Sequence, residues 1–130
     1  MAPRVLVVDD TSSVRFLLRE VLPIHGFEVV AEADSAAEGM KLAEKVQPDL
    51  IILDMEMPIT TGVEAIAPIK ERSPRSKVIL YSSHEGTSVH HEARRRGADA
   101  CFDKLSPLSE MALEMERLLA QDEPNATKPG

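Results

Sequence analysis

Five short runs of large apolar residues recur along the chain, separated by longer stretches with a different pattern. The first four runs are rich in β-branched and other large apolar residues, and the fifth contains Phe102, as is typical of β-strands. They occupy residues 4–8, 27–33, 49–53, 77–82 and 100–103. The central run, Leu50-Ile51-Ile52-Leu53, contains no polar residue, which is typical of a strand buried on both faces. The run at 27–33 is more mixed, as expected for a strand at the edge of a sheet.

The stretches between the runs have the apolar periodicity of amphipathic helices. After the first run, apolar residues three and four positions apart predict one buried stripe, formed by Val14, Leu17, Leu18, Val21 and Leu22. The last stretch has a similar stripe, formed by Leu108, Met111, Ala112, Met115, Leu118 and Leu119. Ser35 and Thr61 each precede a glutamate by three residues, a capping-box pattern that predicts two further helix starts.

Some of the predicted helices are less regular. Pro68 lies inside one of them, where a proline removes a backbone hydrogen bond and costs about 3 kcal/mol, so we expect a kink or an early end there. The segment 85–96 has few apolar residues to bury, so we expect it to be the most weakly anchored helix. Ser106 followed by Pro107 predicts an N-cap with proline at the first helical position.

Strands that alternate with helices predict an α/β fold. We expect a (βα)₅ arrangement, with a doubly wound five-stranded parallel sheet and right-handed crossovers. Residues 1–121 are expected to form one domain. The polar, proline-containing residues 122–130 are expected to form a flexible C-terminal tail or linker stub.

Composition narrows the classes of function. The 22 acidic and 15 basic residues give a net charge of -7, which argues against intrinsic binding to nucleic acid or an anionic membrane. No apolar run approaches the roughly 20 residues of a membrane span, and the start of the chain lacks the pattern of a signal peptide. Cys101 is the only cysteine, so no internal disulfide can form, which fits a reducing cytoplasm.

Polar residues suited to chemistry stand at the carboxyl ends of the predicted strands. Asp9 and Asp10 follow the first strand, Asp54 ends the third, Ser82 ends the fourth and Lys104 follows the fifth. In a parallel sheet these ends share one edge, where open α/β sheets bind their ligands. Converging carboxylates repel unless a cation lies among them, and oxygen ligands of this kind suit Mg²⁺.

This combination favours phosphoryl transfer to Asp54. A carboxylate nucleophile, a divalent ion and a lysine are the parts that such a reaction needs. Taken singly, each residue is ordinary, because Asp and Ser commonly form turns and caps at strand ends. Only their occurrence together at successive strand ends indicates a site.

From Arg4 to about Leu119 the chain resembles the receiver domain of two-component response regulators. The resemblance rests on Val-Val-Asp9-Asp10, Leu-Asp54-Met-Glu-Met-Pro58 with Gly62 after it, Leu-Tyr-Ser82-Ser83, Gly97-Ala98 and Asp103-Lys104. It implies a flavodoxin-like sheet with strand order 2-1-3-4-5.

The resemblance also implies a role for each site residue. Asp54 would accept a phosphoryl group from a phosphohistidine donor. Ser82 would be the switch hydroxyl, and Lys104 would pair with the phosphoryl group. The implied Mg²⁺ ligands are Asp10, Asp54, the backbone carbonyl of Glu56 and, through water, Asp9.

Two positions depart from the family pattern. Lys104 is followed by Leu105, where the family often has a proline with a cis bond. A cis bond to a non-proline residue costs about 2.5–4 kcal/mol, so we expect a trans loop or strain at this point. Cys101 stands where the family usually has the switch aromatic, and the neighbouring Phe102 is expected to point to the other face of the sheet.

We therefore predict a cytoplasmic receiver that works as a phosphorylation-controlled switch of protein–protein interactions, not as an enzyme on a separate substrate. Its partners would be a sensor histidine kinase or histidine phosphotransfer protein, and a downstream protein at the face of the fourth helix, fifth strand and fifth helix. Two alternatives stay open. One is a pseudo-receiver that binds partners without phosphorylation. The other is a hydrolase of the aspartyl-phosphate type, although such enzymes commonly have a second aspartate where this chain has Glu56.

Overall fold

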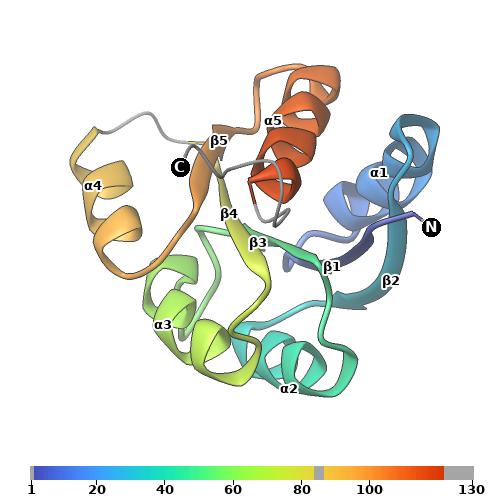
Figure 1. Ribbon diagram of the computed structural model, residues 1–130. Coiled ribbons are helices and arrows are strands. Elements are labelled where there is room, and N and C mark those ends of the chain that lie inside the picture. The colour runs from blue at the N-terminus through green and yellow to red at the C-terminus, as the bar shows by residue number, and fades with distance from the viewer. Residues whose placement is uncertain (1, 84–86, 122–130) are drawn as a thin grey trace, which may run out of the picture.

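Strands and helices alternate along the whole of the described chain (Figure 1). The computed structural model describes residues 2–83 and 87–121. The strands are β1 (Arg4–Val8), β2 (Glu28–Ala33), β3 (Leu50–Asp54), β4 (Lys77–Ser82) and β5 (Ala100–Asp103). The helices are α1 (Ser12–Val21), the short 3₁₀ helix η1 (Leu22–His25), α2 (Ala36–Val46), α3 (Gly62–Arg72), α4 (Thr87–Arg95) and α5 (Leu108–Ala120).

The strands form one parallel sheet in the order β2-β1-β3-β4-β5, which confirms the predicted fold. β2 lies at an edge and β3 in the centre, as the composition of the two runs predicts. Every residue of β3 is buried. Because all strands run in the same direction, their carboxyl ends meet at one edge of the sheet.

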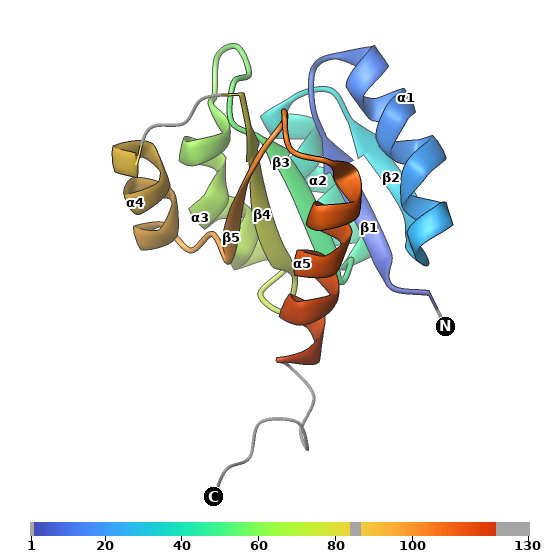
Figure 2. The same ribbon diagram turned by 90° about the horizontal axis from the view of Figure 1, so that it is seen from above.

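Two apolar layers sandwich the sheet. α1 and α5 cover one face, while α2, α3 and α4 cover the other (Figures 1 and 2). Strand β1 illustrates the alternation. Val5 and Val7 pack in the layer with α1 and α5, and Leu6 and Val8 pack in the opposite layer.

The predicted stripe of the first helix is only partly buried. Leu18 and Leu22 are fully buried, but Leu17 is 47% exposed, so its predicted burial was wrong. Leu17 stands about 100° around the helix from Leu18, and a helix that packs on one side of a sheet buries only one arc of its surface. That arc is taken by the other two leucines.

α3 continues past Pro68 as far as Arg72, so the expectation of an early end was wrong. Ile66 and Ile69 on either side of the proline are fully buried in the apolar layer. Their burial offsets the hydrogen bond that the proline removes.

The start of α5 also differs from the prediction. Its N-cap is Pro107 and its first residue is Leu108, so the N-cap expected at Ser106 was wrong. Asp103 explains the difference, because it holds the preceding loop in a turn. Its carboxylate accepts a hydrogen bond from the N–H of Leu105 (2.8 Å), and its carbonyl accepts one from the N–H of Ser106 (3.0 Å).

α4 begins at Thr87, and residues 84–86 lie outside the described part of the chain. Ala93 of this helix is fully buried, and Val89 is half-buried. The weak anchoring of this helix stays a prediction. The tail expected at 122–130 also lies outside the described residues. Within the described ranges, no helix has the length and apolar character needed to cross a bilayer.

Candidate functional site

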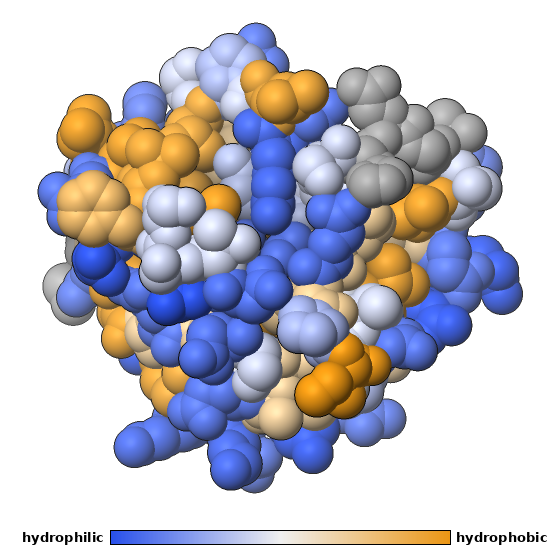
Figure 3. Space-filling model, turned by 180° about the vertical axis from the view of Figure 1, so that it is seen from behind, coloured by the Kyte–Doolittle hydropathy of each residue, from blue (hydrophilic) through white to orange (hydrophobic). Residues whose placement is uncertain are grey.

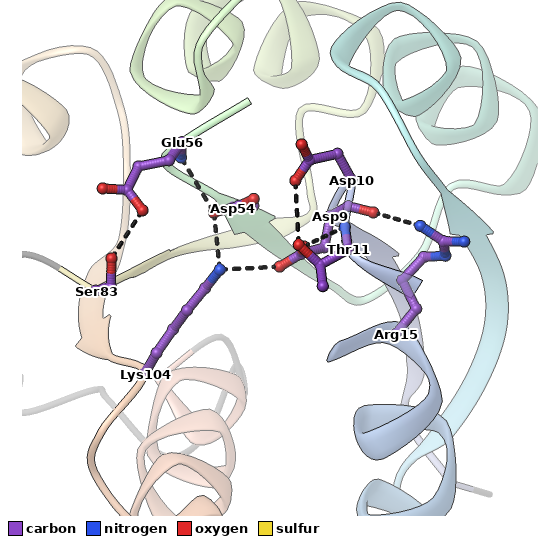
Figure 4. Close-up of polar contacts among 8 residues, drawn as sticks. All are labelled: Asp9, Asp10, Thr11, Arg15, Asp54, Glu56, Ser83 and Lys104. Atoms are coloured by element: carbon purple, nitrogen blue, oxygen red, sulfur yellow. Dashed lines mark hydrogen bonds and ion pairs between the residues drawn. The ribbon is translucent and has the colours of Figure 1, made fainter. Parts of the chain in front are cut away.

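The predicted site residues converge at the carboxyl edge of the sheet (Figure 4). β1 leads directly into Asp9, and its last residue pairs with the residue before Asp54 on β3. β5 leads into Lys104, whose backbone N–H donates to the carbonyl of Ser82 at the end of β4 (2.8 Å). Parallel pairing between neighbouring strands therefore brings Asp9, Asp10, Asp54 and Lys104 together and sets Ser82 beside them.

Three carboxylates form a cluster at this edge. Asp9, Asp10 and Asp54 each have a carboxylate oxygen within 4.8 Å of those of the other two. Asp9 and Asp54 are each only 1% exposed, whereas Asp10 is exposed. Negative charges this close repel one another, most strongly where water is excluded. The cluster therefore requires positive charge.

Lys104 supplies part of that charge. Its Nζ lies 3.0 Å from Oδ1 of Asp54 and 3.2 Å from Oδ2 of Asp9 (Figure 4). Burial alone would lower the pKa of Lys104, but the hydrogen bond to Asp54 and the charges of both carboxylates outweigh burial and raise it. The lysine is consequently a permanent cation that bridges two strands.

The loop after Lys104 contains only trans peptide bonds, as does the rest of the described chain. The expected trans loop at Leu105 is therefore confirmed. Cys101 packs in the layer of α2, α3 and α4, and Phe102 in the layer of α1 and α5, so the two side chains lie on opposite faces as predicted. Burial raises the pKa of the Cys101 thiol, which makes it a poorer nucleophile at neutral pH.

The carboxyl group of Asp54 has a pKa of about 6. Burial is the main cause of the rise, and the charge of Asp9 adds to it. The N–H of Glu56, 3.0 Å from Oδ1, and the ammonium of Lys104 both lower the pKa, but by less. At neutral pH Asp54 is therefore mostly ionised, as a carboxylate nucleophile must be.

The cluster suits a divalent cation. Oδ2 of Asp9 is buried and accepts no hydrogen bond of good geometry from the described residues, although the Lys104 ammonium stands 3.2 Å away. A buried carboxylate oxygen without a hydrogen bond is costly unless a charge compensates it. Hard oxygen ligands in modest number, with one side open to solvent at Asp10, match the preference of Mg²⁺.

Gly62 allows the turn after β3 to close on the strand. A Cβ at this position would lie 2.0 Å from the carbonyl oxygen of Asp54, so a larger residue cannot fit without moving the strand end. The N–H of Gly62 donates to the carbonyl of Met55 (3.0 Å). The sequence pattern includes Gly62, but only the structure gives the reason for a glycine.

Two contacts at the site were not predicted. Ser83 Oγ donates to Oε1 of Glu56 (2.7 Å) and so connects the loops after β4 and β3 (Figure 4). Arg15 Nη1 donates to the backbone carbonyl of Asp9 (2.7 Å). Loop contacts of this kind leave no periodic signal, and an arginine in the first turns of a helix looks like an ordinary solvated residue.

Figure 3 looks toward the carboxyl edge from outside. Hydrophilic residues occupy the middle of this face, and hydrophobic residues gather around them. The large apolar residues exposed on α1 and on the loops at this edge are Phe16, Leu17, Ile59 and Leu105. This face of the molecule is therefore hydrophilic in the middle, with hydrophobic residues around it.

Comparison with known proteins gives a consistent result. Residues 5–116 match the family described as the response regulator receiver domain. The chain is 35% identical over 98 residues to the chemotaxis protein CheY of Bacillus subtilis (strain 168), which covers 75% of this chain and 82% of that protein. It is 36% identical over 104 residues to the chemotaxis protein CheY of Halobacterium salinarum, which covers 80% and 86% of the two chains.

Longer proteins contain a similar segment. A protein-glutamate methylesterase/protein-glutamine glutaminase of Haloarcula marismortui is 35% identical over 120 residues, which make up 32% of that protein. Among solved structures, a two-component response regulator of the LuxR family from Aurantimonas sp. SI85-9A1 has a TM-score of 0.87 at 29% identity, covering 92% of this chain and 86% of that one. The response regulator domain of Thermotoga maritima CheB has a TM-score of 0.78 at 31% identity, covering 93% and 96%. The chain therefore belongs to the receiver domains of response regulators, a family whose standard role is to accept a phosphoryl group in two-component signalling.

Proposed function

We propose that Asp54 takes a phosphoryl group from the phosphohistidine of a sensor histidine kinase or a histidine phosphotransfer protein. The observation that carries this proposal is the bridge from one ammonium group, on Lys104, to two buried carboxylates, on Asp9 and Asp54. This arrangement holds a nucleophile ionised in a pocket that also offers positive charge to an incoming phosphoryl group.

The transfer needs little movement of the acceptor. The bonds from Glu56 and Lys104 both go to Oδ1 of Asp54, which leaves Oδ2 as the oxygen for attack. An O–P bond forms at this oxygen while the P–N bond of the donor breaks. The electron pair stays on the imidazole nitrogen, which is reprotonated from solvent. Lys104 then pairs with the negatively charged oxygens of the transferred group.

Asp10, Asp54 and the backbone carbonyl of Glu56 are assigned as ligands of Mg²⁺, with Asp9 acting through water. When bound, Mg²⁺ would neutralise the acidic cluster and the charge on the phosphoryl oxygens. The three carboxylates, of which those of Asp9 and Asp54 are buried, support this assignment.

Phosphorylation replaces the single negative charge of the Asp54 carboxylate with roughly two on the phosphoryl group. Ser82 would turn its hydroxyl toward the new group, and the population of α4 positions would shift. A downstream protein would bind at the face of α4, β5 and α5.

The receiver unit is assigned to residues 1–121 and to the cytoplasm, and it would catalyse only its own phosphorylation and dephosphorylation. The exposed hydrophobic residues around the hydrophilic middle of the face shown in Figure 3 support a protein as phosphoryl donor.

One observation favours an alternative in which the chain binds partners without phosphorylation. Cys101 occupies the position of the switch aromatic, and Phe102 lies on the opposite face of the sheet. In the family, movement of the switch hydroxyl is usually coupled to rotation of this aromatic ring. Here the position has no ring that could rotate. The acidic cluster and its lysine support the phosphoacceptor over this pseudo-receiver.

Incubation with acetyl phosphate followed by intact-protein mass spectrometry tests the proposal. We expect a gain of one phosphoryl group that depends on Mg²⁺ and disappears in Asp54→Ala. Asp34→Asn is the matched control, because Asp34 is an exposed acid just after β2 and should leave phosphorylation unchanged. A Mg²⁺-dependent gain that persists in Asp54→Ala would refute the assignment of the acceptor.

A further inference from the structure

Asp9 is held by three hydrogen bonds from different parts of the chain. Its N–H donates to the carbonyl of Ala33 on β2 (3.0 Å). Its Oδ1 accepts from the N–H of Thr11 (2.9 Å), and its carbonyl accepts from Nη1 of Arg15 (2.7 Å). Together these bonds fix the peptide between Asp9 and Asp10, and with it the direction in which the Asp10 side chain leaves the backbone.

Arg15 is itself held in place. Its Nε lies 3.5 Å from Oε1 of Glu32 on the edge strand, and the other oxygen of Glu32 lies 2.5 Å from Nη1 of Arg19. The side chains of Arg15 and Glu32 are only 21% and 22% exposed, whereas Arg19 is 47% exposed. A planar guanidinium with fixed donors suits this double contact, with one nitrogen on a carboxylate and another on a carbonyl.

We propose that Arg15 is a positioning residue for the magnesium site. It holds the carbonyl of Asp9 so that the carboxylates of Asp9 and Asp10 face Asp54 across the pocket. Glu32 keeps the guanidinium in place and offsets its charge. The inference rests on the proposed function, because it concerns the Mg²⁺ site assigned there.

Arg15 could affect the metal site through its charge or by positioning the turn at Asp9. These two roles predict opposite changes in Mg²⁺ affinity when Arg15 is removed. If the guanidinium acted only as a nearby positive charge, its removal would strengthen the binding of a divalent cation to the acidic cluster. If it positions the turn, its removal weakens binding. Loss of a group that orients metal ligands typically lowers metal affinity by about 10- to 100-fold, and we expect about tenfold here.

The test is a titration of ¹⁵N-labelled protein with Mg²⁺ alone, followed by NMR. In Arg15→Met we expect the dissociation constant for Mg²⁺ to rise about tenfold, with amide shifts in the absence of metal confined to the Asp9–Thr11 turn and its neighbours. Arg15→Lys keeps a donor and the charge, so its constant should fall between those of the wild type and Arg15→Met. Arg19→Met removes the other contact of Glu32 without touching Asp9 and should bind like the wild type.

Equal or tighter Mg²⁺ binding by Arg15→Met would overturn the inference. Mg²⁺ binding weakened equally in Arg19→Met would also overturn it. The loss would then follow from removing any arginine from the surface of α1 and not from the contact of Arg15 with Asp9. If Arg15→Met does not fold, Arg15→Lys is compared with Arg19→Met. Weaker Mg²⁺ binding in Arg15→Lys than in Arg19→Met supports the inference, and equal binding overturns it. A wild-type protein that does not bind Mg²⁺ at all would instead refute the proposed function, so the two failures are distinguishable.

Discussion

Asp54 combines burial with charge, and its titration therefore affects the stability of the fold. Its pKa rises from 3.8 to about 6, mainly because burial disfavours the carboxylate. The folded protein consequently binds this proton more tightly than the unfolded chain does. The stability that Asp54 contributes is fully present below pH 3.8 and is lost as the pH rises through about 6.

Asp54→Asn should therefore stabilise the metal-free protein at neutral pH. Asparagine keeps the size of the side chain and removes the charge that the buried site disfavours. We expect the free energy of unfolding at pH 7.5 to rise by about 1–3 kcal/mol, with the difference shrinking between pH 6 and pH 4. Urea unfolding across this pH range measures it.

Asp34→Asn, which changes an exposed acid just after the edge strand, serves as the control and should change stability by no more than about 0.5 kcal/mol. A wild type whose advantage over Asp54→Asn grows as the pH rises from 4 to 7.5 would contradict the raised pKa.

Gly62→Ala should damage the site more than its small size suggests. The added methyl group would collide with the backbone carbonyl of Asp54, and backbone cannot yield as a flexible side chain can. We expect a loss of about 2–4 kcal/mol in the free energy of unfolding and weaker Mg²⁺ binding by the folded fraction. Thermal unfolding with and without Mg²⁺ measures both.

Gly26→Ala provides the comparison. Gly26 has a φ of +92°, but no atom beyond its two neighbours in the chain lies within 4 Å of the place that an added methyl group would take. The substitution should therefore lower the free energy of unfolding by about 1–2 kcal/mol, because alanine disfavours the left-handed backbone conformation. Mg²⁺ binding should be unchanged. Equal effects of the two substitutions on Mg²⁺ binding would show that Gly62 has no special relation to Asp54.

Among single residues, the sequence predicts the acids and the lysine that meet, because strand ends in a parallel sheet share one edge. It does not predict the contact of Arg15 with Asp9 or that of Ser83 with Glu56. Both depend on the direction of a side chain across a turn or between two loops. Such directions are set by tertiary packing and have no period in the sequence.

Among the helices and strands, α3 has the clearest conflict between local preference and observed structure, at Pro68. The helix runs through the proline and buries Ile66 and Ile69, so packing wins over the lost hydrogen bond. Pro68→Ala restores an N–H that can donate to the carbonyl four residues earlier. We expect the free energy of unfolding to rise by about 1–2 kcal/mol. The gain from removing a proline from the helix is partly offset, because alanine gives the unfolded chain more conformational entropy.

Pro74→Ala is the matched control for chemical unfolding, because Pro74 is exposed in the turn before β4. There the substitution only adds freedom to the unfolded chain, so stability should fall by up to about 1 kcal/mol. A loss of stability in Pro68→Ala equal to that in Pro74→Ala would mean that the proline does not strain α3.

The helices and strands also show where sequence patterns are sufficient. β4 and β5 have the predicted bounds, since each is an apolar run that ends in a polar residue at the sheet edge. The burial of Leu17 and the N-cap at Ser106 were predicted wrongly. The first depends on how much of α1 the sheet covers, and the second on hydrogen bonds to Asp103. Neither can be inferred from spacing alone.

In the molecule as a whole, the parallel sheet separates the chemistry from the core. Both apolar layers are closed by helices (Figure 2), and the polar side chains that can react gather at one edge (Figure 4). We therefore propose that a new charge at Asp54 acts mainly on the surrounding loops and on α4, which contributes Ala93 to the buried residues of its layer. That division allows a receiver to switch while it stays folded.

Amide NMR spectra with Mg²⁺, before and after addition of beryllium fluoride as a phosphoryl mimic, show whether Asp54 controls such a switch. Shifts are predicted first at the turn after β1 and the end of β3, and then, with the mimic, at Ser82, Lys104 and along α4 and β5. Asp54→Ala should abolish the second set. Spectra that the mimic leaves unchanged in the presence of Mg²⁺, or changes equally in Asp54→Ala, would contradict a phosphorylation switch at Asp54.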